Sequence, residues 1–237
     1  MADRQVKGRG RAGNAWTSPD GCLMFSYSQE LGLDGRLIPF VQYVVCLAVT
    51  EAVARVTGER LGGNSEVGLR IKWPNDIYNQ EGSLKVGGIL CQSTYREGHF
   101  QLVAGLGLNL DNEQPTTCIN RLLEEEAGRL GLTPPRPVGR EELLAALLQD
   151  LEDMTGVLLA QGFGPLRDLY LSRWLHSGQA VQAEAEEPGV GVVHMTIEGI
   201  APSGFLLGRD ARGQGFELHP DGNSFDFMRG LIRKKVV

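Results

Sequence analysis

The segment RIKWPNDIYN, residues 70–79, restricts the fold more than any other part of the sequence. The alternating apolar residues that lead into its tryptophan predict a strand with one buried face. Pro74 must end that strand, because proline lacks a backbone donor and keeps the preceding residue extended. Lys72, Asn75 and Asp76 therefore lie near one strand end, where open α/β sheets bind ligands. A turn with solvated side chains explains the same residues equally well.

Hydrophobic periodicity predicts both strands and helices in the rest of the chain. After residue 177, turn residues recur roughly every ten positions, which is typical of a small β-barrel or sandwich. We therefore expect an α+β fold, with a mixed β-sheet packed with helices over residues 1–176 and a small β-domain over residues 177–237. Residues 1–15 are expected to form a loop. The expected strands are 22–28, 67–73, 84–94 and 99–110, with a hairpin between the last two, and the expected helices are 37–56, 119–130, 141–160 and 166–175.

Composition excludes several classes of protein. The net charge of −6 and the pI of about 5.3 argue against a nucleic-acid binder that works through an overall basic field. Four widely spaced cysteines without a Cys-x-x-Cys motif indicate reduced thiols, and the four histidines show no zinc-ligand spacing. The longest apolar run, residues 41–49, is too short to span a bilayer. We expect a cytoplasmic protein without nucleic-acid or membrane partners.

The segment KGRGRAGN, residues 7–14, has the glycine spacing of a dinucleotide-binding loop. We reject that interpretation because no apolar strand precedes it. Two interpretations remain: a loop whose backbone N–H groups, Arg9 and Arg11 wrap an anion, or a disordered basic tail. Trp16 favours the ordered loop, since an indole rarely lies in a tail.

Two glycine-containing strands are further candidates for a binding surface. In LKVGGIL, residues 84–90, Lys85 enters a strand with two adjacent glycines, which suits an anion lying over bare backbone. An edge-strand lysine beside a bulge is the alternative. In GLGLNL, residues 105–110, leucines alternate with two glycines and Asn109. The bare face suits a flat ligand, although tight packing of a helix on the sheet would explain it as well.

These segments, in this order, resemble the catalytic core of biotin–protein ligases, and KWPND is the most specific of them. The C-terminal HSGQ and ELHPDGNSFDFMRGLIRKK are similar to the eukaryotic holocarboxylase synthetase branch. The resemblance implies the class II synthetase-like fold of biotin and lipoate ligases, with an SH3-like C-terminal barrel. It also implies an enzyme, a biotin–[acetyl-CoA-carboxylase] ligase. Such an enzyme makes biotinyl-5′-AMP from biotin and ATP with Mg²⁺, then transfers biotin to a lysine on the biotin carboxyl carrier domain of carboxylases.

The resemblance also implies roles for individual residues. Lys85 would hold the biotin carboxylate and later the adenylate phosphate, Trp16 would order the loop, and Asp76 would orient or deprotonate the acceptor lysine. Arg229 and Arg233 are candidates on charge alone. The candidate catalytic residues are Lys85, Arg11, Lys72, Asn75 and Asp76, and the candidate binding residues for biotin and nucleotide are Gln5, Gly8, Arg9, Gly10, Arg11, Trp16, Lys85, Gly87, Gly88 and Asn109.

One departure from the family pattern concerns the start of the chain. In the family, a strand with a Ser/Thr-Thr-Asn segment and a helix precede the glycine–arginine loop, whereas this sequence starts almost at the loop. We therefore expect an N-terminally truncated catalytic core that binds biotin weakly or is inactive. A lipoate-type ligase and a non-catalytic protein that binds an adenylate or a carrier domain stay open as alternatives. An organelle form with an added targeting segment is compatible with the expected cytoplasmic location.

Overall fold

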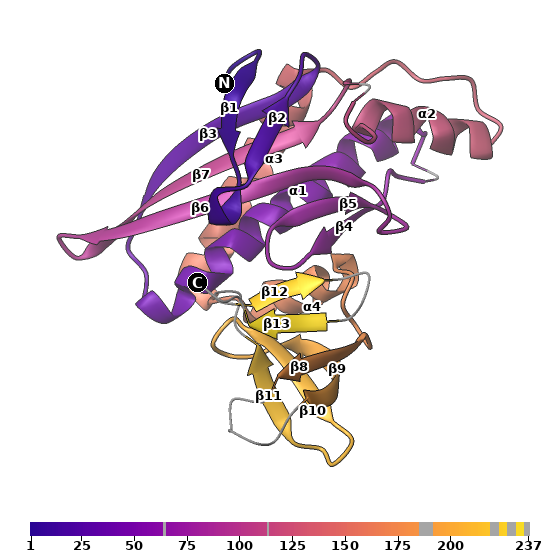
Figure 1. Ribbon diagram of the computed structural model, residues 1–237. Helices are drawn as coiled ribbons and strands as arrows, with labels where there is room; N and C mark the ends of the chain where they lie inside the picture. The colour runs from indigo at the N-terminus through magenta and orange to yellow at the C-terminus, as the bar shows by residue number, and fades with distance from the viewer. Residues whose placement is uncertain (64, 113, 185–191, 219–222, 227–230, 235–237) are drawn as a thin grey trace. The chain divides into compact units, whose positions relative to one another are not determined.

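A computed structural model describes the whole chain except residues 64, 113, 185–191, 219–222, 227–230 and 235–237 (Figure 1). The chain divides into two compact units, Met1–Leu175 and His176–Val237. The break lies one residue before the boundary expected from the sequence. The first unit combines a sheet, an N-terminal hairpin and helices, while the described part of the second consists mainly of strands.

A five-stranded sheet in the order β3-β7-β6-β5-β4 forms the centre of the first unit. All of its strand pairs are antiparallel. Lys72 and Asp76 lie at adjoining ends of β4 and β5, because the chain turns back at KWPND into β5, a strand that was not expected from the sequence. The strands are β3 (Cys22–Leu31), β4 (Leu69–Lys72), β5 (Asp76–Asn79), β6 (Lys85–Arg96) and β7 (His99–Asn109).

The N-terminal segment is a β-hairpin, so the expectation of a loop over residues 1–15 is wrong. Strand β1 (Gln5–Arg9) pairs antiparallel with β2 (Ala15–Ser18) through the short 3₁₀ helix η1 (Arg11–Gly13). A Cβ at Gly8 would lie 2.6 Å from the carbonyl oxygen of Trp16, so the hairpin closes this tightly only around a glycine. These residues form regular structure, which agrees with the ordered alternative and not with a disordered basic tail.

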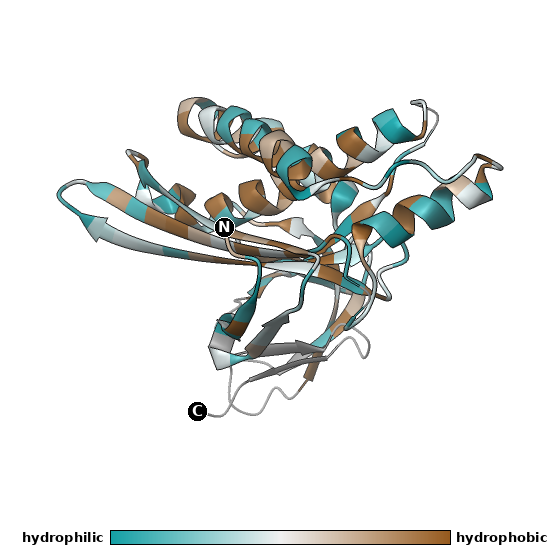
Figure 2. Cartoon of the chain, turned by 90° about the horizontal axis from the view of Figure 1, so that it is seen from above, coloured by the Kyte–Doolittle hydropathy of each residue, from teal (hydrophilic) through white to brown (hydrophobic). Residues whose placement is uncertain are grey.

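The helices of the first unit gather on one side of the sheet (Figure 2). Helix α1 contacts β4 and β6 as well as α3 and α4, which explains why it is apolar almost all round. The segment Gly35–Arg60 is long and apolar enough to cross a membrane, but 72% of its most apolar window is buried inside the protein, as expected for a core helix. The helices are α1 (Ile38–Arg60), α2 (Ile119–Arg129), α3 (Arg140–Gln161) and α4 (Gly164–Arg173).

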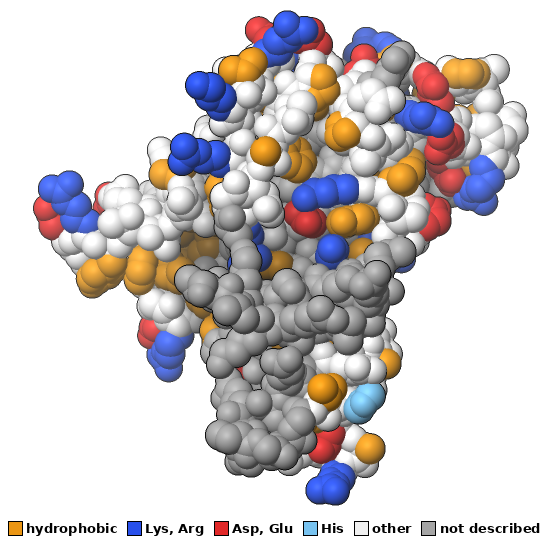
Figure 3. Space-filling model, viewed as in Figure 1, with side chains coloured by type: hydrophobic (Ala, Val, Ile, Leu, Met, Phe, Trp, Pro, Cys, Tyr) orange, Lys and Arg blue, Asp and Glu red, His pale blue; other side chains and the backbone are white. Residues whose placement is uncertain are grey.

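The sheet has one face covered by helices and one open face. Leu106 and Leu108 of β7 are buried, and Gly107 between them faces the opposite side, against Trp16. The alternation of GLGLNL therefore predicts the two faces correctly. Lysine and arginine side chains lie next to acidic ones over β5 and β6 on the open face (Figure 3).

The second unit forms a six-stranded sheet in the order β11-β10-β9-β8-β13-β12. Its β8–β13 pair is parallel and its other pairs are antiparallel, so this sheet is mixed. The expected β-domain is present, while its SH3-like barrel form stays a prediction. The strands are β8 (Ala180–Glu184), β9 (Val192–Ile200), β10 (Leu206–Asp210), β11 (Gly215–Leu218), β12 (Asn223–Asp226) and β13 (Leu231–Lys234).

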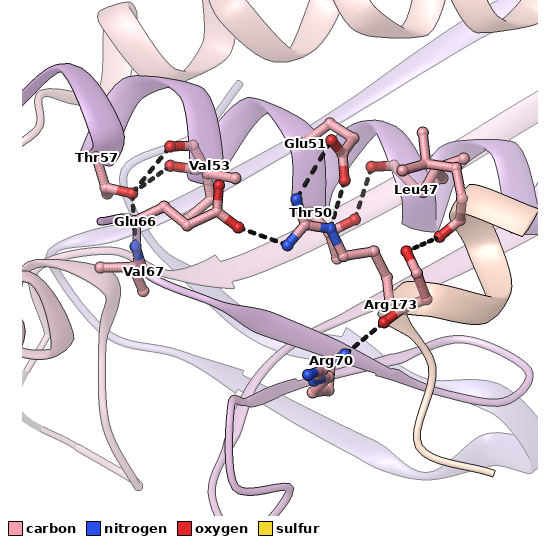
Figure 4. A network of polar contacts seen from close by, with 12 residues as sticks. Leu47, Thr50, Glu51, Val53, Thr57, Glu66, Val67, Arg70 and Arg173 are labelled. Atoms are coloured by element: carbon pink, nitrogen blue, oxygen red, sulfur yellow. Dashed lines mark hydrogen bonds and ion pairs between the residues drawn. The ribbon is translucent and has the colours of Figure 1, made fainter. Parts of the chain in front are cut away.

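Arg173, the last residue of α4, links three parts of the first unit (Figure 4). Its Nε donates to Glu51 of α1 at 2.6 Å and its Nη1 donates to Glu66 at 2.5 Å. Burial lowers the pKa of Arg173, but the hydrogen bonds to both glutamates raise it, and the net shift is upward. Arg70 of β4 donates to the carbonyl of Ser172 beside it. The end of α4 is thus tied to α1 and to the sheet.

We expect Arg173→Met to lower the free energy of unfolding by about 1–3 kcal/mol, because two partly buried carboxylates lose their shared cation. Urea denaturation followed by circular dichroism measures this change. Arg167→Met is the matched control on the same helix. The side chain of Arg167 is 44% exposed, and its Nη1 lies 3.9 Å from Oδ1 of Asp168, so only a weak ion pair is lost. Equal destabilisation by both substitutions would contradict a specific role for the Arg173 network.

Candidate active site

A row of five residues crosses the open face of the sheet. Lys72, Asp76, Gly88, Gly107 and Met24 are successive Cα partners on β4, β5, β6, β7 and β3. Directly opposite residues in a sheet project to the same face, so this row forms one continuous strip. Its two central positions have no side chain. The strip therefore contains a flat area of bare backbone, here called the glycine floor (Gly88 and Gly107).

The indole of Trp16 lies across the glycine floor. A Cβ at Gly107 would be 2.8 Å from Nε1 of Trp16, and a Cβ at Gly88 would be 3.6 Å from its Cζ3. Trp16 belongs to β2, so this contact packs the N-terminal hairpin against the open face of the sheet. The hairpin and the glycine floor thus border the same site.

Lys85 and Asp76 meet at the edge of the glycine floor. Nζ of Lys85 donates to Oδ1 of Asp76 at 2.7 Å, and the two side chains are 33% and 25% exposed. The same Nζ lies 5.2 Å from the ring centroid of Trp16, within the range of a cation–π interaction. A Cβ at Gly88 would lie 3.5 Å from Oδ1 of Asp76 and 3.7 Å from Cε of Lys85. A cation, a carboxylate and an indole therefore converge above one glycine.

The KWPND loop is fixed on both sides. Nε1 of Trp73 donates to the hydroxyl of Tyr43 on α1 at 2.7 Å. The side-chain amide of Asn75 donates to the carbonyl of Ile89 at 2.8 Å, and the N–H of Ile89 donates to the carbonyl of Asn75 at 2.9 Å. Asn75 thus anchors the loop to β6, and the neighbouring Asp76 is held at the edge of the floor.

Two more of the candidate residues lie beside the floor with defined partners. Lys72, the Cα partner of Asp76, has its ammonium 5.6 Å from the ring centroid of Tyr78. Asn109 is only 4% exposed, and its amide donates to the hydroxyl of Thr116 at 3.3 Å. Asn109 therefore holds the segment after β7 in place next to the floor.

The two adjacent glycines of β6 serve different purposes. Gly88 faces the open side, as the ligand interpretation of KVGG requires. Gly87 faces the helices, and a Cβ there would lie 2.5 Å from Cδ2 of Leu108. The structure therefore brings Gly88 into the site and leaves Gly87, which was expected to bind ligand as well, in the packed core.

The hairpin carries the remaining candidates. Oε1 of Gln5 accepts a hydrogen bond from the hydroxyl of Ser18 at 3.4 Å, and Arg9 is exposed on β1. Burial raises the pKa of Tyr43 on α1, while the Trp73 hydrogen bond and the positive charge of Arg11 act to lower it. The backbone between these side chains contains Gly8 and Gly10.

Several candidates and features lie outside this arrangement. Arg229 is outside the described residues, and Arg233 is placed by its backbone alone, on β13. In the part of the chain that the structure describes, no group of three or more His, Cys, Asp or Glu residues could hold a metal ion. Gly107 belongs to the site but was not among the candidate residues. The alternation of glycines and Asn109 with leucines along β7 already predicted that Gly107 lies on the bare face of the strand.

A cavity of about 460 Å³ is lined by other residues of the first unit, among them Asp3, Asp20 and Arg140. None of the candidate site residues lines this cavity. Lys85, Asp76 and Trp16 converge on the glycine floor instead, so we assign the candidate active site to the floor.

Similarity to known proteins identifies the family of this chain. Residues 1–109 match the biotin/lipoate A/B protein ligase family. The chain is 48% identical to biotin–protein ligase 2 of Arabidopsis thaliana over its whole length and covers 69% of that protein. The chain belongs to the biotin–protein ligase family. The family prediction is therefore confirmed.

Two further comparisons agree with this membership. The chain is 48% identical over its full length to the chloroplastic biotin–protein ligase 1 of the same plant, of which it spans 62%. The solved structure of Aquifex aeolicus biotin protein ligase in complex with biotin and ATP matches with 26% identity and a TM-score of 0.67. That match covers 91% of this chain and 83% of the Aquifex chain. The predicted α+β ligase fold is thereby confirmed.

We expect Gly107→Ala to loosen the hairpin, because the new methyl group would meet the indole of Trp16 at 2.8 Å. Trypsin should then cut after Arg9 and Arg11 faster, about tenfold for a local destabilisation near 1.4 kcal/mol. Gly105→Ala is the matched control on the same strand and face, since its methyl group would lie 3.6 Å from its nearest neighbour, Oγ of Ser26, which is an ordinary contact distance. Unchanged cleavage of Gly107→Ala would contradict the seating of Trp16 on the floor.

Proposed function

We propose that this chain activates biotin with ATP as biotinyl-5′-AMP and transfers it to a lysine of a biotin carboxyl carrier domain. The observation that carries this proposal is the position of Lys85, whose ammonium lies at the edge of the glycine floor beneath Trp16. The names of the Arabidopsis relatives and the biotin and ATP of the Aquifex complex support it.

The chemistry requires cations near bare backbone. In the first step the biotin carboxylate attacks the α-phosphorus of ATP and pyrophosphate leaves, so two anions must be brought together. Lys85 is suited to hold the carboxylate, while Arg9 and Arg11 of the hairpin are suited to bind phosphate oxygens. The glycine floor admits a flat ring system close to the backbone. These residues therefore match the needs of adenylate formation.

The second step transfers the acyl group. The amine of the acceptor lysine attacks the acyl carbon of the mixed anhydride, AMP leaves, and the amine loses a proton. Asp76 is suited to orient that lysine, since its carboxylate lies at the edge of the floor beside Lys85. Exclusion of water by the hairpin would protect the anhydride from hydrolysis.

Magnesium enters the proposal as part of the MgATP substrate. Mg²⁺ usually keeps several waters and is held through one or two carboxylates together with substrate phosphates. When bound, the ion would neutralise phosphate charge.

Lipoate is the second candidate substrate, because the matched family contains biotin and lipoate ligases. The carrier-domain partner remains part of the proposal. We keep a cytoplasmic location as the expected one, and the name of the chloroplastic relative makes an organelle form equally compatible.

We expect Lys85→Ala to reduce biotin-dependent pyrophosphate release by about 100-fold or more, because one preorganised cation is worth this much in a water-excluded site. The assay contains the chain, MgATP, biotin and a carrier domain, and biotin transfer is read by streptavidin blot. Arg96→Ala, an exposed cation at the far end of β6, is the control and should stay within about twofold. Equal activity of Lys85→Ala and wild type would exclude the assigned role of Lys85.

Competition between acids separates the candidate functions. Biotin and lipoate are offered together with MgATP and hydroxylamine, which traps each acyl-adenylate as a hydroxamate. We expect the biotin hydroxamate to predominate. Predominance of the lipoate product would assign the chain to lipoate activation, and the absence of both products and of pyrophosphate from a folded chain would indicate a non-catalytic binder.

A further inference from the structure

The cation of the proposed site already holds a carboxylate. Asp76 accepts from Nζ of Lys85 at 2.7 Å, a distance typical of a charge-assisted hydrogen bond. Both side chains are partly buried, with 33% and 25% exposure, so solvent screens this pair less than a fully exposed one. An incoming substrate carboxylate therefore meets an ammonium whose charge is already compensated.

The ion pair lies where a ligand on the floor would lie. A Cβ at Gly88 would contact Asp76, Lys85 and the Trp16 indole at 3.5–3.7 Å, so the three side chains surround the same small volume. Two carboxylates crowded at one ammonium repel each other strongly. The carboxylate of Asp76 and that of a bound acid would thus compete for the same Nζ.

Asp76 has a second cation within reach. Lys72 is its Cα partner across the β4–β5 pair, and opposite side chains in a sheet are direct neighbours. Tyr78 is two residues beyond Asp76 on β5 and so faces the same side of the sheet, and Nζ of Lys72 lies 5.6 Å from the centroid of its ring. Burial and then the negative charge of Asp76 raise the pKa of Tyr78, in agreement with this arrangement. A carboxylate displaced from Lys85 would therefore remain next to a positive charge.

We propose that Asp76 is an internal competitor of the substrate acid: it serves as the counter-ion of Lys85 in the empty site and is displaced when a carboxylate binds there. This inference rests on the proposed function, because it takes the substrate to be biotin. The competition costs the chain affinity for the acid but not for an uncharged derivative of the same ring system. Removal of the Asp76 charge should therefore strengthen binding, which is the opposite of the usual result of changing a site residue.

Asp76→Asn tests this inference, since asparagine keeps the shape and removes the charge. Isothermal titration of the wild-type chain and the variant with biotin and with biotin methyl ester gives four dissociation constants. We expect Asp76→Asn to bind biotin about three- to tenfold more tightly, in line with a partly exposed ion pair, and to leave the ester unchanged. Asp153→Asn, which alters the net charge equally on α3, should change neither constant.

The outcomes separate the inference from the proposed function. Unchanged or weaker biotin binding by Asp76→Asn, with tight binding by wild type, overturns the competition and leaves the ligase proposal standing. Equal tightening for biotin and for its ester also overturns it, because the effect would then not depend on the carboxylate. Failure of the wild-type chain to bind biotin at all removes both. If Asp76→Asn does not fold, Asp76→Ser with the same two ligands replaces it, and the same results decide.

Discussion

The packing of one indole on two bare glycines is the contact on which the proposed site depends. Gly88 and Gly107 are neighbours across β6 and β7, and Trp16 covers both. The β1–β2 hairpin is short, and an isolated hairpin is marginally stable in water. Its position over the sheet therefore depends on such packing, and the positions of the hairpin arginines follow from it. The packing of Trp16 on the glycine floor thus helps to position the positive charges of the hairpin at a site that must bind two anions.

Antiparallel register brings the chemically active segments together. KWPND and KVGG are separated along the chain, but the β5–β6 pairing places Asp76 opposite Gly88 and so beside Lys85. The register changes between Ile77 and Tyr78, and this irregularity helps place Lys85 at the floor rather than one residue away. A slip of one residue would turn the strand over and send Asp76 into the helix-covered face. Register is therefore as important to the site as residue identity.

The sequence predicted those parts of the fold whose pattern is long and strongly periodic. Helix α1 and the β6–β7 hairpin were placed within a few residues, because their apolar residues decide burial locally. The β1–β2 hairpin was missed because its strands are short and mostly exposed, so no alternation marks them. Gly87 was assigned to ligand binding because sequence alone does not tell which of two adjacent glycines faces the helices. The missed hairpin and the facing of Gly87 both depend on contacts between segments that are distant in the sequence, which form only when the chain folds.

The empty site also illustrates a conflict between stability and binding. Lys85, whose side chain is two-thirds buried, carries an ammonium that is costly without a partner, so Asp76 and the Trp16 ring stabilise the chain before any ligand arrives. The same partners reduce the gain available to an incoming carboxylate, since only the difference between the two interactions contributes to affinity. This conflict is resolved if the interaction between Lys85 and Asp76 is only moderately strong. Lys85 is held in position in the empty site and can exchange one carboxylate for another, while the displaced Asp76 stays next to Lys72, its Cα partner across the β4–β5 pair.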